Sequence, residues 1–356
     1  MKITLRFKII VGIAAICLLL FNTNPASAGN RWIDGSAGNN LDEIIRDPIR
    51  NKIYVLDNGT AELVVINTET EKITKRIPIA AGGNVTDIAL SKDNQWMGIA
   101  SGEYATFVNL NNGNTHEYSH PDLAYIVSIA FDYNGDVFIV GMEPGYGNRS
   151  LIYHLEWPTG NVMNQFGVAS DLSSKVYKGL MRTDNTGTML YVGERGLSPL
   201  SITKIDVSTP TPVFVAEDNH GELGSNLKDI VISPRYDEIY VASGAPYGIQ
   251  VVDSNTISFI ALLDTGAYPG GVDINVPGDA IYGIPHSPYN NNMYKFDAQS
   301  RELIETYELL DEWYYTSPAD RGIAVGRFGF KTFIVSEDYA MSEMKIQVVD
   351  SLTSCY

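Results

Sequence analysis

The sequence contains very little cysteine. Cys17 and Cys355 are the two cysteines among 356 residues, and Cys17 lies in an N-terminal apolar run that we expect to be removed. Cys355 alone cannot form an internal disulfide, and no Cys-x-x-Cys-His haem attachment motif occurs. Cys355 is then either an unpaired thiol near the C-terminus or half of an intermolecular disulfide.

Basic residues are also scarce. The chain has 25 Lys and Arg against 42 Asp and Glu, a formal charge of −17. This sign disfavours nucleic acid as a partner, because nucleic-acid binding depends on Lys and Arg that neutralise phosphates. It leaves cationic ligands or a basic protein partner open.

Long apolar runs are absent beyond the N-terminus. Ile9 to Phe21 is shorter than the roughly 20 apolar residues of a membrane span, and no later segment approaches that length. With Lys2 and Arg6 before it and a small-residue cleavage site at Ala26-Ser27-Ala28, residues 1–28 have the three parts of a signal peptide. We therefore expect export to the periplasm, another extracytoplasmic compartment or the cell surface, with 29–356 as one mature domain carrying a formal charge of −20.

Familiar catalytic motifs are missing as well. The chain has no Gly-x-Ser-x-Gly elbow, His-Glu-x-x-His helix, phosphate-binding glycine loop or dinucleotide fingerprint. Asp132-x-Asn134-x-Asp136 begins like a calcium loop but lacks the following Gly and the late Glu, so it predicts a hairpin turn. We assign no catalytic residue, and no cofactor is evident.

A repeat of 41 to 51 residues runs through the chain and predicts its fold. Seven apolar anchors begin at Glu43, Asp87, Ser128, Gly179, Asp229, Asp273 and Gly322. A turn rich in Asp, Asn, Gly and Pro follows each anchor, then a second strand such as Ile53-Tyr54-Val55, and usually a third and fourth. No useful stretch has a helical period. The pattern predicts an all-β, seven-bladed propeller of four-stranded antiparallel blades. Its last blade runs out of chain, so we expect the N-terminal strand at Asn30 to Asp34 to close the ring.

The first repeat resembles a known family. Ile53-Tyr54-Val55-Leu56-Asp57-Asn58-Gly59, followed by Val64-Val65-Ile66-Asn67, is similar to the repeat of YVTN-type, quinoprotein-like propellers. That resemblance implies the fold and no activity. In size, signal peptide and lack of a haem motif, the chain also resembles the propeller (beta) subunits of the hydrazine synthases of anaerobic ammonium oxidisers (anammox bacteria), which implies membership of an enzyme complex.

Acidic residues stand at several anchors. Glu43, Asp87, Asp229 and Asp273 map to equivalent positions near one mouth of the central channel. One hypothesis is a site for Ca²⁺ or a cationic ligand, since Ca²⁺ takes several carboxylate oxygens. The alternative is structural: each carboxylate accepts hydrogen bonds from loop amides and keeps the blades in register.

Loops on one face supply further candidates, namely His120, Arg195, His220, Tyr247, His286 and Tyr289. Three histidines on one face suit a metal or acid–base site, yet no ligand spacing such as His-x-x-x-His occurs, and solvated loop histidines explain them equally. Trp313, Tyr314 and Tyr315, in a longer insertion, form either an exposed patch for a partner or a plug for the channel.

Three functional hypotheses follow. The first is a non-catalytic interaction or structural subunit of an extracytoplasmic complex, including a hydrazine synthase-like redox complex. The second is a metal-assisted lyase or lactonase at the channel mouth, with His220 or His286 as acid or base. The third is a surface-layer or matrix protein.

Overall fold

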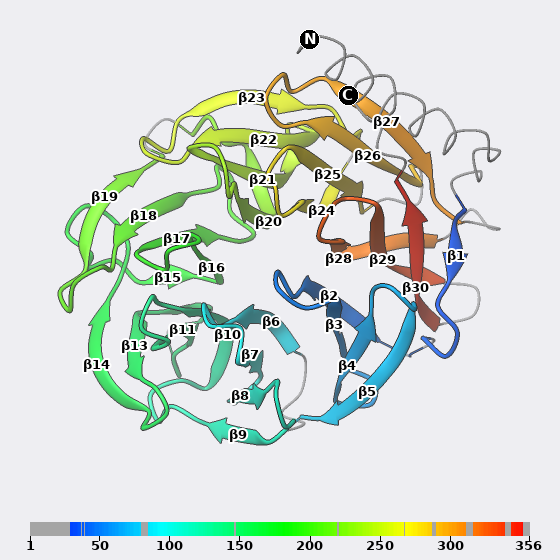
Figure 1. The fold of residues 1–356 in the computed structure, drawn as a ribbon. Coiled ribbons are helices and arrows are strands. Elements are labelled where there is room, and N and C mark those ends of the chain that lie inside the picture. Colours follow the sequence, from blue (N-terminus) through cyan, green and yellow to red (C-terminus); the bar gives the residue numbers. More distant parts are fainter. Residues whose placement is uncertain are drawn as a thin grey trace, which may run out of the picture.

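The chain folds into a set of β-sheets arranged as a ring (Figure 1). The computed structural model describes residues 29–36, 38, 40–79, 85–145, 147–218, 221–266, 268–286, 290–310, 316–338 and 343–351. These residues form seven four-stranded antiparallel sheets and one short two-stranded sheet. The predicted seven-bladed β-propeller is confirmed.

The first three blades follow the chain in order. Blade 1 contains β2 (Leu41–Arg46), β3 (Lys52–Asp57), β4 (Glu62–Asn67) and β5 (Lys72–Pro78). Blade 2 contains β6 (Val85–Leu90), β7 (Trp96–Ser101), β8 (Tyr104–Asn109) and β9 (Thr115–Tyr118). Blade 3 contains β10 (Tyr125–Phe131), β11 (Val137–Met142), β13 (Ile152–Glu156) and β14 (Asn161–Phe166). An insertion adds the small sheet of β12 (Arg149–Ser150) and β15 (Val176–Tyr177).

The remaining blades repeat this plan. Blade 4 contains β16 (Gly179–Thr183), β17 (Met189–Glu194), β18 (Ile202–Asp206) and β19 (Val213–Glu217). Blade 5 contains β20 (Ser225–Ile232), β21 (Glu238–Ala245), β22 (Gly248–Asp253) and β23 (Phe259–Leu263). Blade 6 contains β24 (Pro269–Ile274), β25 (Ala280–Pro285), β26 (Asn292–Asp297) and β27 (Leu303–Glu308). Blade 7 contains β28 (Thr316–Val325), β29 (Lys331–Asp338), β30 (Glu343–Asp350) and β1 (Arg31–Trp32).

Blade 7 joins the two ends of the chain. The strand β1 pairs antiparallel with β30, with Arg31 opposite Val348 and Trp32 opposite Gln347. The amide of Ile33 then donates to the carbonyl of Ile346 at 2.9 Å, extending the pairing beyond the strand. The N-terminal segment therefore covers an edge that would otherwise lie open, as the sequence predicted.

The hydrophobic core lies between the blades. Each buried cluster joins two neighbouring blades, as where Ile53 and Val55 of blade 1 pack with Phe333 and Val335 of blade 7. This follows from the alternation of side chains along a strand, because both faces of every blade meet a neighbour. The second strands are accordingly apolar on both faces, and the rigid wall they form supports the channel.

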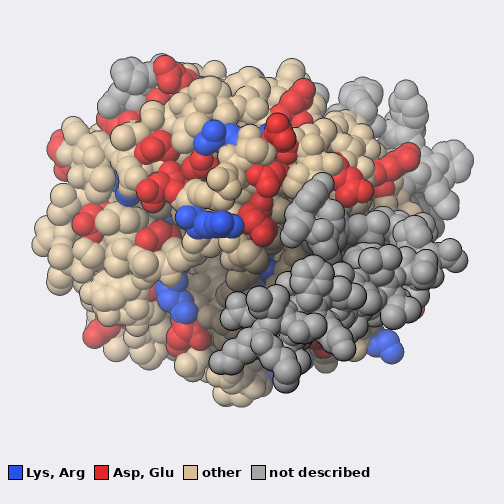
Figure 2. Space-filling view, turned by 45° about the horizontal axis from the view of Figure 1, so that its top comes forward, with Lys and Arg blue, Asp and Glu red and all other residues tan. Residues whose placement is uncertain are grey.

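The outer surface carries the excess of acidic side chains. Asp and Glu predominate over Lys and Arg on the face shown in Figure 2, in keeping with the formal charge of −17. Within the part of the chain that the structure describes, there is no helix of the length and hydrophobicity needed to traverse a membrane.

Candidate functional site

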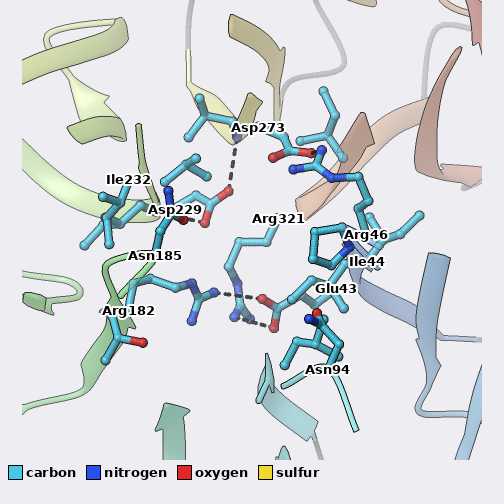
Figure 3. Close-up of a pocket in the computed structure, with 18 of the residues that line it drawn as sticks. Glu43, Ile44, Arg46, Asn94, Arg182, Asn185, Asp229, Ile232, Asp273 and Arg321 are labelled. Carbon is cyan, nitrogen blue, oxygen red and sulfur yellow. Dashed lines mark hydrogen bonds and ion pairs between the residues drawn. The ribbon is translucent and has the colours of Figure 1, made fainter. Parts of the chain in front are cut away.

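The channel contains two cavities, one at each end of the innermost strands. The downstream cavity, where these strands end, measures about 340 Å³ and is lined by Glu43, Asp229, Asp273, Arg46 and Arg182 among others (Figure 3). The upstream cavity, where they begin, measures about 760 Å³. Arg321 is the one described residue that lines both, so its side chain separates them.

The predicted acidic residues hold one blade to the next. Oε2 of Glu43 accepts the amide of Ile88 at 2.9 Å, and Oδ2 of Asp87 accepts that of Ile129 at 3.1 Å. Oδ2 of Asp229 accepts the amide of Val272, also at 3.1 Å. In each pair the donor belongs to the innermost strand of the next blade. A bulge precedes or includes the acceptor in its own strand, and such bulges commonly re-aim a side chain.

Asp273 departs from this pattern. In blade 5 the residue opposite Tyr240 is Val231, two residues after Asp229. In blade 6 the residue opposite the corresponding Tyr282 is Asp273 itself. Asp273 therefore lies two residues further along its strand than the equivalence read from the sequence. It still accepts an amide of the next blade, that of Val325, at 2.7 Å.

Two guanidinium groups occupy the centre of the acidic cluster (Figure 3). Arg321 donates to Glu43 at 2.7 Å and to Asp87 at 3.0 Å. Arg182 donates to the same two carboxylates, at 2.8 Å in both cases. Both carboxylates are buried, and the side chain of Arg321 is 7% exposed. The cluster is thus a buried ion network rather than an open carboxylate ring.

Every oxygen of the four carboxylates already has a hydrogen-bond donor. Arg46 bonds Asp273 at 3.0 Å, and every carboxylate oxygen accepts at least one hydrogen bond from an amide, a hydroxyl or a guanidinium. A Ca²⁺ ion would compete with three positive charges for these oxygens. The arrangement favours the structural hypothesis, and the Ca²⁺ hypothesis stays a prediction.

Burial and the neighbouring arginines shift the pKa values of these four carboxyl groups in different directions. Burial raises the pKa of Glu43 to about 8, against the attraction of Arg321. Burial also acts on Asp87, but Arg182 and Arg321 outweigh it and hold the pKa of that carboxyl below its usual range. Burial raises the pKa of Asp229 to about 6 and also raises that of Asp273. Glu43 and Asp229 thus titrate near neutral pH.

Asp229 gives a pH-dependent prediction. Because its folded-state pKa is about 6, the folded state binds more protons than the unfolded state between about pH 4 and pH 6, and stability falls as pH rises through that window. Asp229→Asn removes this contribution. From pH 4 to pH 7 we expect the wild type to lose about 2–3 kcal/mol of unfolding free energy relative to the variant, measured by urea denaturation. The exposed Asp34→Asn is the control; an identical pH profile for Asp229→Asn would contradict the assignment.

Lys92 is a further group in the downstream cavity. Its ammonium donates to the backbone carbonyls of Asp184 at 2.5 Å and Thr183 at 3.4 Å. Burial lowers the pKa of Lys92 to about 8. Lys92 and Asp229 thus both have pKa values near neutral at this end of the channel. Such pKa values are found in acid–base catalytic groups, and they also arise in structural ion networks.

Three of the loop residues predicted for one face, Arg195, Tyr247 and His286, lie at or beside the upstream cavity. Arg195 lines the upstream cavity. Tyr247 contacts Tyr268, another lining residue, with ring centroids 5.0 Å apart. Nδ1 of His286 lies 3.0 Å from the carbonyl of Pro318 and 3.4 Å from Oδ1 of Asp320, which also lines that cavity.

His120 lies away from such a site. It is buried, its ring centroid is 4.0 Å from that of Tyr153, and burial lowers its pKa, so the ring is a neutral packing element. His220, Tyr289, Trp313, Tyr314, Tyr315 and Cys355 lie outside the described residues. The hypotheses for them stay predictions.

The Asp132 turn has the form that the sequence predicted. Oδ1 of Asp132 accepts the amides of Asn134 at 2.7 Å and Asp136 at 2.9 Å, closing the turn between β10 and β11. Oδ2 lies 3.2 Å from Nε2 of His154, and Oδ1 of Asp136 accepts the amide of Trp157 at 2.8 Å. The side chains of Asp132, Asp136 and His154 therefore lie close together. The hydrogen bonds that close the turn account for this proximity.

Sequence reasoning missed the cationic half of the network. Arg182 and Arg321 stand within or beside apolar anchor segments, and Arg46 ends the first one. A charge inside an innermost strand has nowhere to go but the channel, because the other directions are filled by neighbouring strands and blades. That signal was present at all three positions.

Comparison with known proteins shows the fold. No family model matches the sequence, and no curated protein matches it, so the YVTN-type resemblance stays a prediction. Among solved structures, the chain is similar to a chain of the Kuenenia stuttgartiensis hydrazine synthase. The TM-score is 0.65 at 12% sequence identity, over 88% of this chain and 96% of that one. At that identity the likeness extends to the architecture alone.

Proposed function

We propose that the protein is an exported, non-catalytic propeller that serves as an interaction or structural subunit of an extracytoplasmic multiprotein complex. The observation that carries this proposal is an apolar belt on the outermost strands of blades 3 to 6. A subunit of this kind needs an apolar surface for its partner and a rigid body behind that surface.

The belt continues over four consecutive blades. Its members are Val162 and Met163 of β14, Val213 and Val215 of β19, Phe259, Ile260 and Leu262 of β23, and Leu303 and Ile304 of β27. Each is between 37% and 54% exposed. Single exposed apolar residues are ordinary, but a series repeated at the same place in successive blades is not.

The outermost strands of blades 1 and 2 are different. The strand β5 has the sequence Lys-Ile-Thr-Lys-Arg-Ile-Pro and β9 has Thr-His-Glu-Tyr. Their exposed positions are mostly charged or polar. Around the outside of the ring, the apolar belt of blades 3 to 6 is thus set against a polar arc formed by the outermost strands of blades 1 and 2. This asymmetry suits a partner that covers one side of the propeller only.

The channel and the fold likeness agree with this function. The carboxylates of the channel are bound within the buried ion network, which supports a scaffold over a metal-assisted lyase or lactonase. The likeness to a chain of a hydrazine synthase supports, as its narrower form, a subunit of a redox complex whose other members hold the haem.

The test is isolation of the tagged, full-length chain from the source organism, followed by native mass spectrometry. We expect a complex with other subunits. Val213→Glu and Leu303→Glu place a charge in the apolar belt and are expected to lower partner recovery by about tenfold or more. Haem absorption in the recovered complex would support the redox form.

Thr115→Glu, on the exposed polar arc, is the matched control and should leave recovery unchanged. A monomeric wild-type chain in the native spectrum would contradict the proposal. Equal recovery of the partner with the two belt variants and with the control would show that the apolar belt is not the interface. Surface labelling of an ordered array of this chain would favour the surface-layer hypothesis.

A further inference from the structure

The upstream cavity has a different character from the rest of the protein. Its described lining contains four basic side chains and one acidic side chain, Asp320, although acidic residues outnumber basic ones 42 to 25 in the whole chain. The basic residues are Lys178, Arg195, Lys228 and Arg321. Two of them are neutralised: Lys228 pairs with Asp320 at 2.7 Å, and Arg321 pairs with the buried carboxylates beneath it.

Arg195 is held in place without being neutralised. Its Nε donates to the carbonyl of Lys178 at 3.2 Å, and its Nη2 donates to that of Val127 at 3.2 Å. Among the described residues, no carboxylate lies within ion-pair distance of the guanidinium; Asp87, Glu43 and Asp42, all outside the lining, act on it only through space. Carbonyl acceptors fix the orientation of a guanidinium and leave its charge available to an anion.

Lys178 supplies a second uncompensated charge next to Arg195. Its ammonium lies 5.6 Å from the ring centroid of Tyr177, and it forms no ion pair with a described residue. Burial and the neighbouring Arg321 lower the pKa of Arg195 to about 10, so its guanidinium remains positive at neutral pH. Arg195 is half-buried and Lys178 is exposed at the edge of the cavity, so the partly desolvated guanidinium is the group that gains most from an anionic ligand.

The backbone around the cavity is strained. Four non-glycine lining residues have left-handed backbone angles: Lys178 (φ 43°), Asn226 (φ 56°), Tyr268 (φ 55°) and Arg321 (φ 57°). Lys178, Asn226 and Tyr268 stand at the start of the innermost strands of blades 4 to 6, and Arg321 lies at the irregularity of β28 between Pro318 and Ile323. Each such conformation costs about 1–3 kcal/mol, and residues held this way cluster at ligand sites. The strain therefore marks this end of the channel independently of its charge.

We propose that the upstream cavity binds a small anion that carries a carboxylate or phosphate group, with Arg195 and Lys178 as its charged partners. Tyr125 and Tyr268 supply aromatic walls beside them. The volume of about 760 Å³ falls within the range of small-molecule sites. The two free charges suit a dianion. This site lies inside the ring, away from the apolar belt, and does not rest on the proposed subunit function.

The test is calorimetric titration of the full mature chain with inorganic phosphate and, separately, with succinate, at low ionic strength because salt screens such contacts. We expect saturable binding of at least one probe. Arg195→Met and Lys178→Met should each weaken that binding by about tenfold or more. Binding of phosphate alone assigns a phosphate ester, binding of succinate alone assigns a carboxylate, and binding of both assigns a general oxyanion site.

Arg327→Met, which removes an exposed arginine outside the cavity, is the control and should bind as the wild type does. Circular dichroism and gel filtration establish that each variant is folded, and the Lys178 variant tests the proposal even if the Arg195 variant fails to fold. Two results overturn the proposal. One is the absence of saturable binding of either probe up to about 10 mM; the other is unchanged affinity in the folded variants.

Discussion

Replacing Arg321 with methionine is expected to lower the free energy of unfolding by about 3–5 kcal/mol at about pH 8, because two buried carboxylates lose a shared positive partner. Glu43 and Asp87 are buried and both bond this guanidinium. Arg182 remains and bonds both carboxylates, but one cation cannot balance two anions in a site with little water.

The loss in Arg321→Met should be smaller at low pH. Arg182 and Arg321 hold the pKa of Asp87 below its usual range, so without Arg321 this carboxyl takes up a proton at a higher pH than in the wild type. At low pH the variant thereby removes an uncompensated charge, whereas the wild type has none to remove. Urea denaturation at about pH 5 and pH 8 measures the difference. Arg327→Met, at an exposed turn, is the control and should change stability by less than about 0.5 kcal/mol. A loss that does not depend on pH would contradict the electrostatic explanation.

The second large effect is expected from Ile33→Asp, a loss of about 3–5 kcal/mol. Ile33 is 4% exposed and belongs to the cluster that joins blades 1 and 7. Its backbone amide extends the pairing of β1 with β30. A carboxylate at this position both removes apolar burial and places an unpaired charge under the closing strand, so the edge of β30 should open.

Trp32→Ser tests whether the loss of stability is specific to the buried Ile33 or follows from any change in the strand β1. Trp32 is the preceding residue, 39% exposed, and we expect a loss of less than about 1 kcal/mol from its replacement. Thermal unfolding followed by circular dichroism compares the two variants. Hydrogen exchange then locates the change, since amides of β30 should lose protection in Ile33→Asp first. Equal stability losses in both variants would argue against a specific closing role for Ile33.

The sequence predicted the architecture well because a propeller repeats itself. An anchor, a turn and a tyrosine-containing second strand recur in most blades, so errors at one unit are corrected by the others. The closing strand was predictable for a different reason: the last repeat lacks an outer strand and the N-terminus has one to spare. Both arguments rest on edge pairing, which every blade requires.

The site was predicted less completely. The acidic residues were found, since they recur at the anchors, but Asp273 was given the wrong register. Asp229 stands 11 residues before Tyr240 (240 − 229), whereas Asp273 stands 9 before Tyr282 (282 − 273), and this two-residue difference is the one that the strand pairing shows. The pairing of Arg321 with Glu43 joins residues 278 positions apart, a contact that only ring closure creates. A buried carboxylate in the sequence indicates that a positive or hydrogen-bonding partner must lie beside it, but only the fold shows which residue that partner is.

The pairing of β1 with β30 also bears on how the chain reaches its folded state. Arg31 and Asp350, 319 positions apart in sequence, must find one another before the last blade is complete. Contacts of such high sequence separation form slowly, since a long loop must close first. The segment made first therefore waits for the segment made last, and until then the unfinished blade exposes a strand edge on which chaperones or neighbouring chains can act.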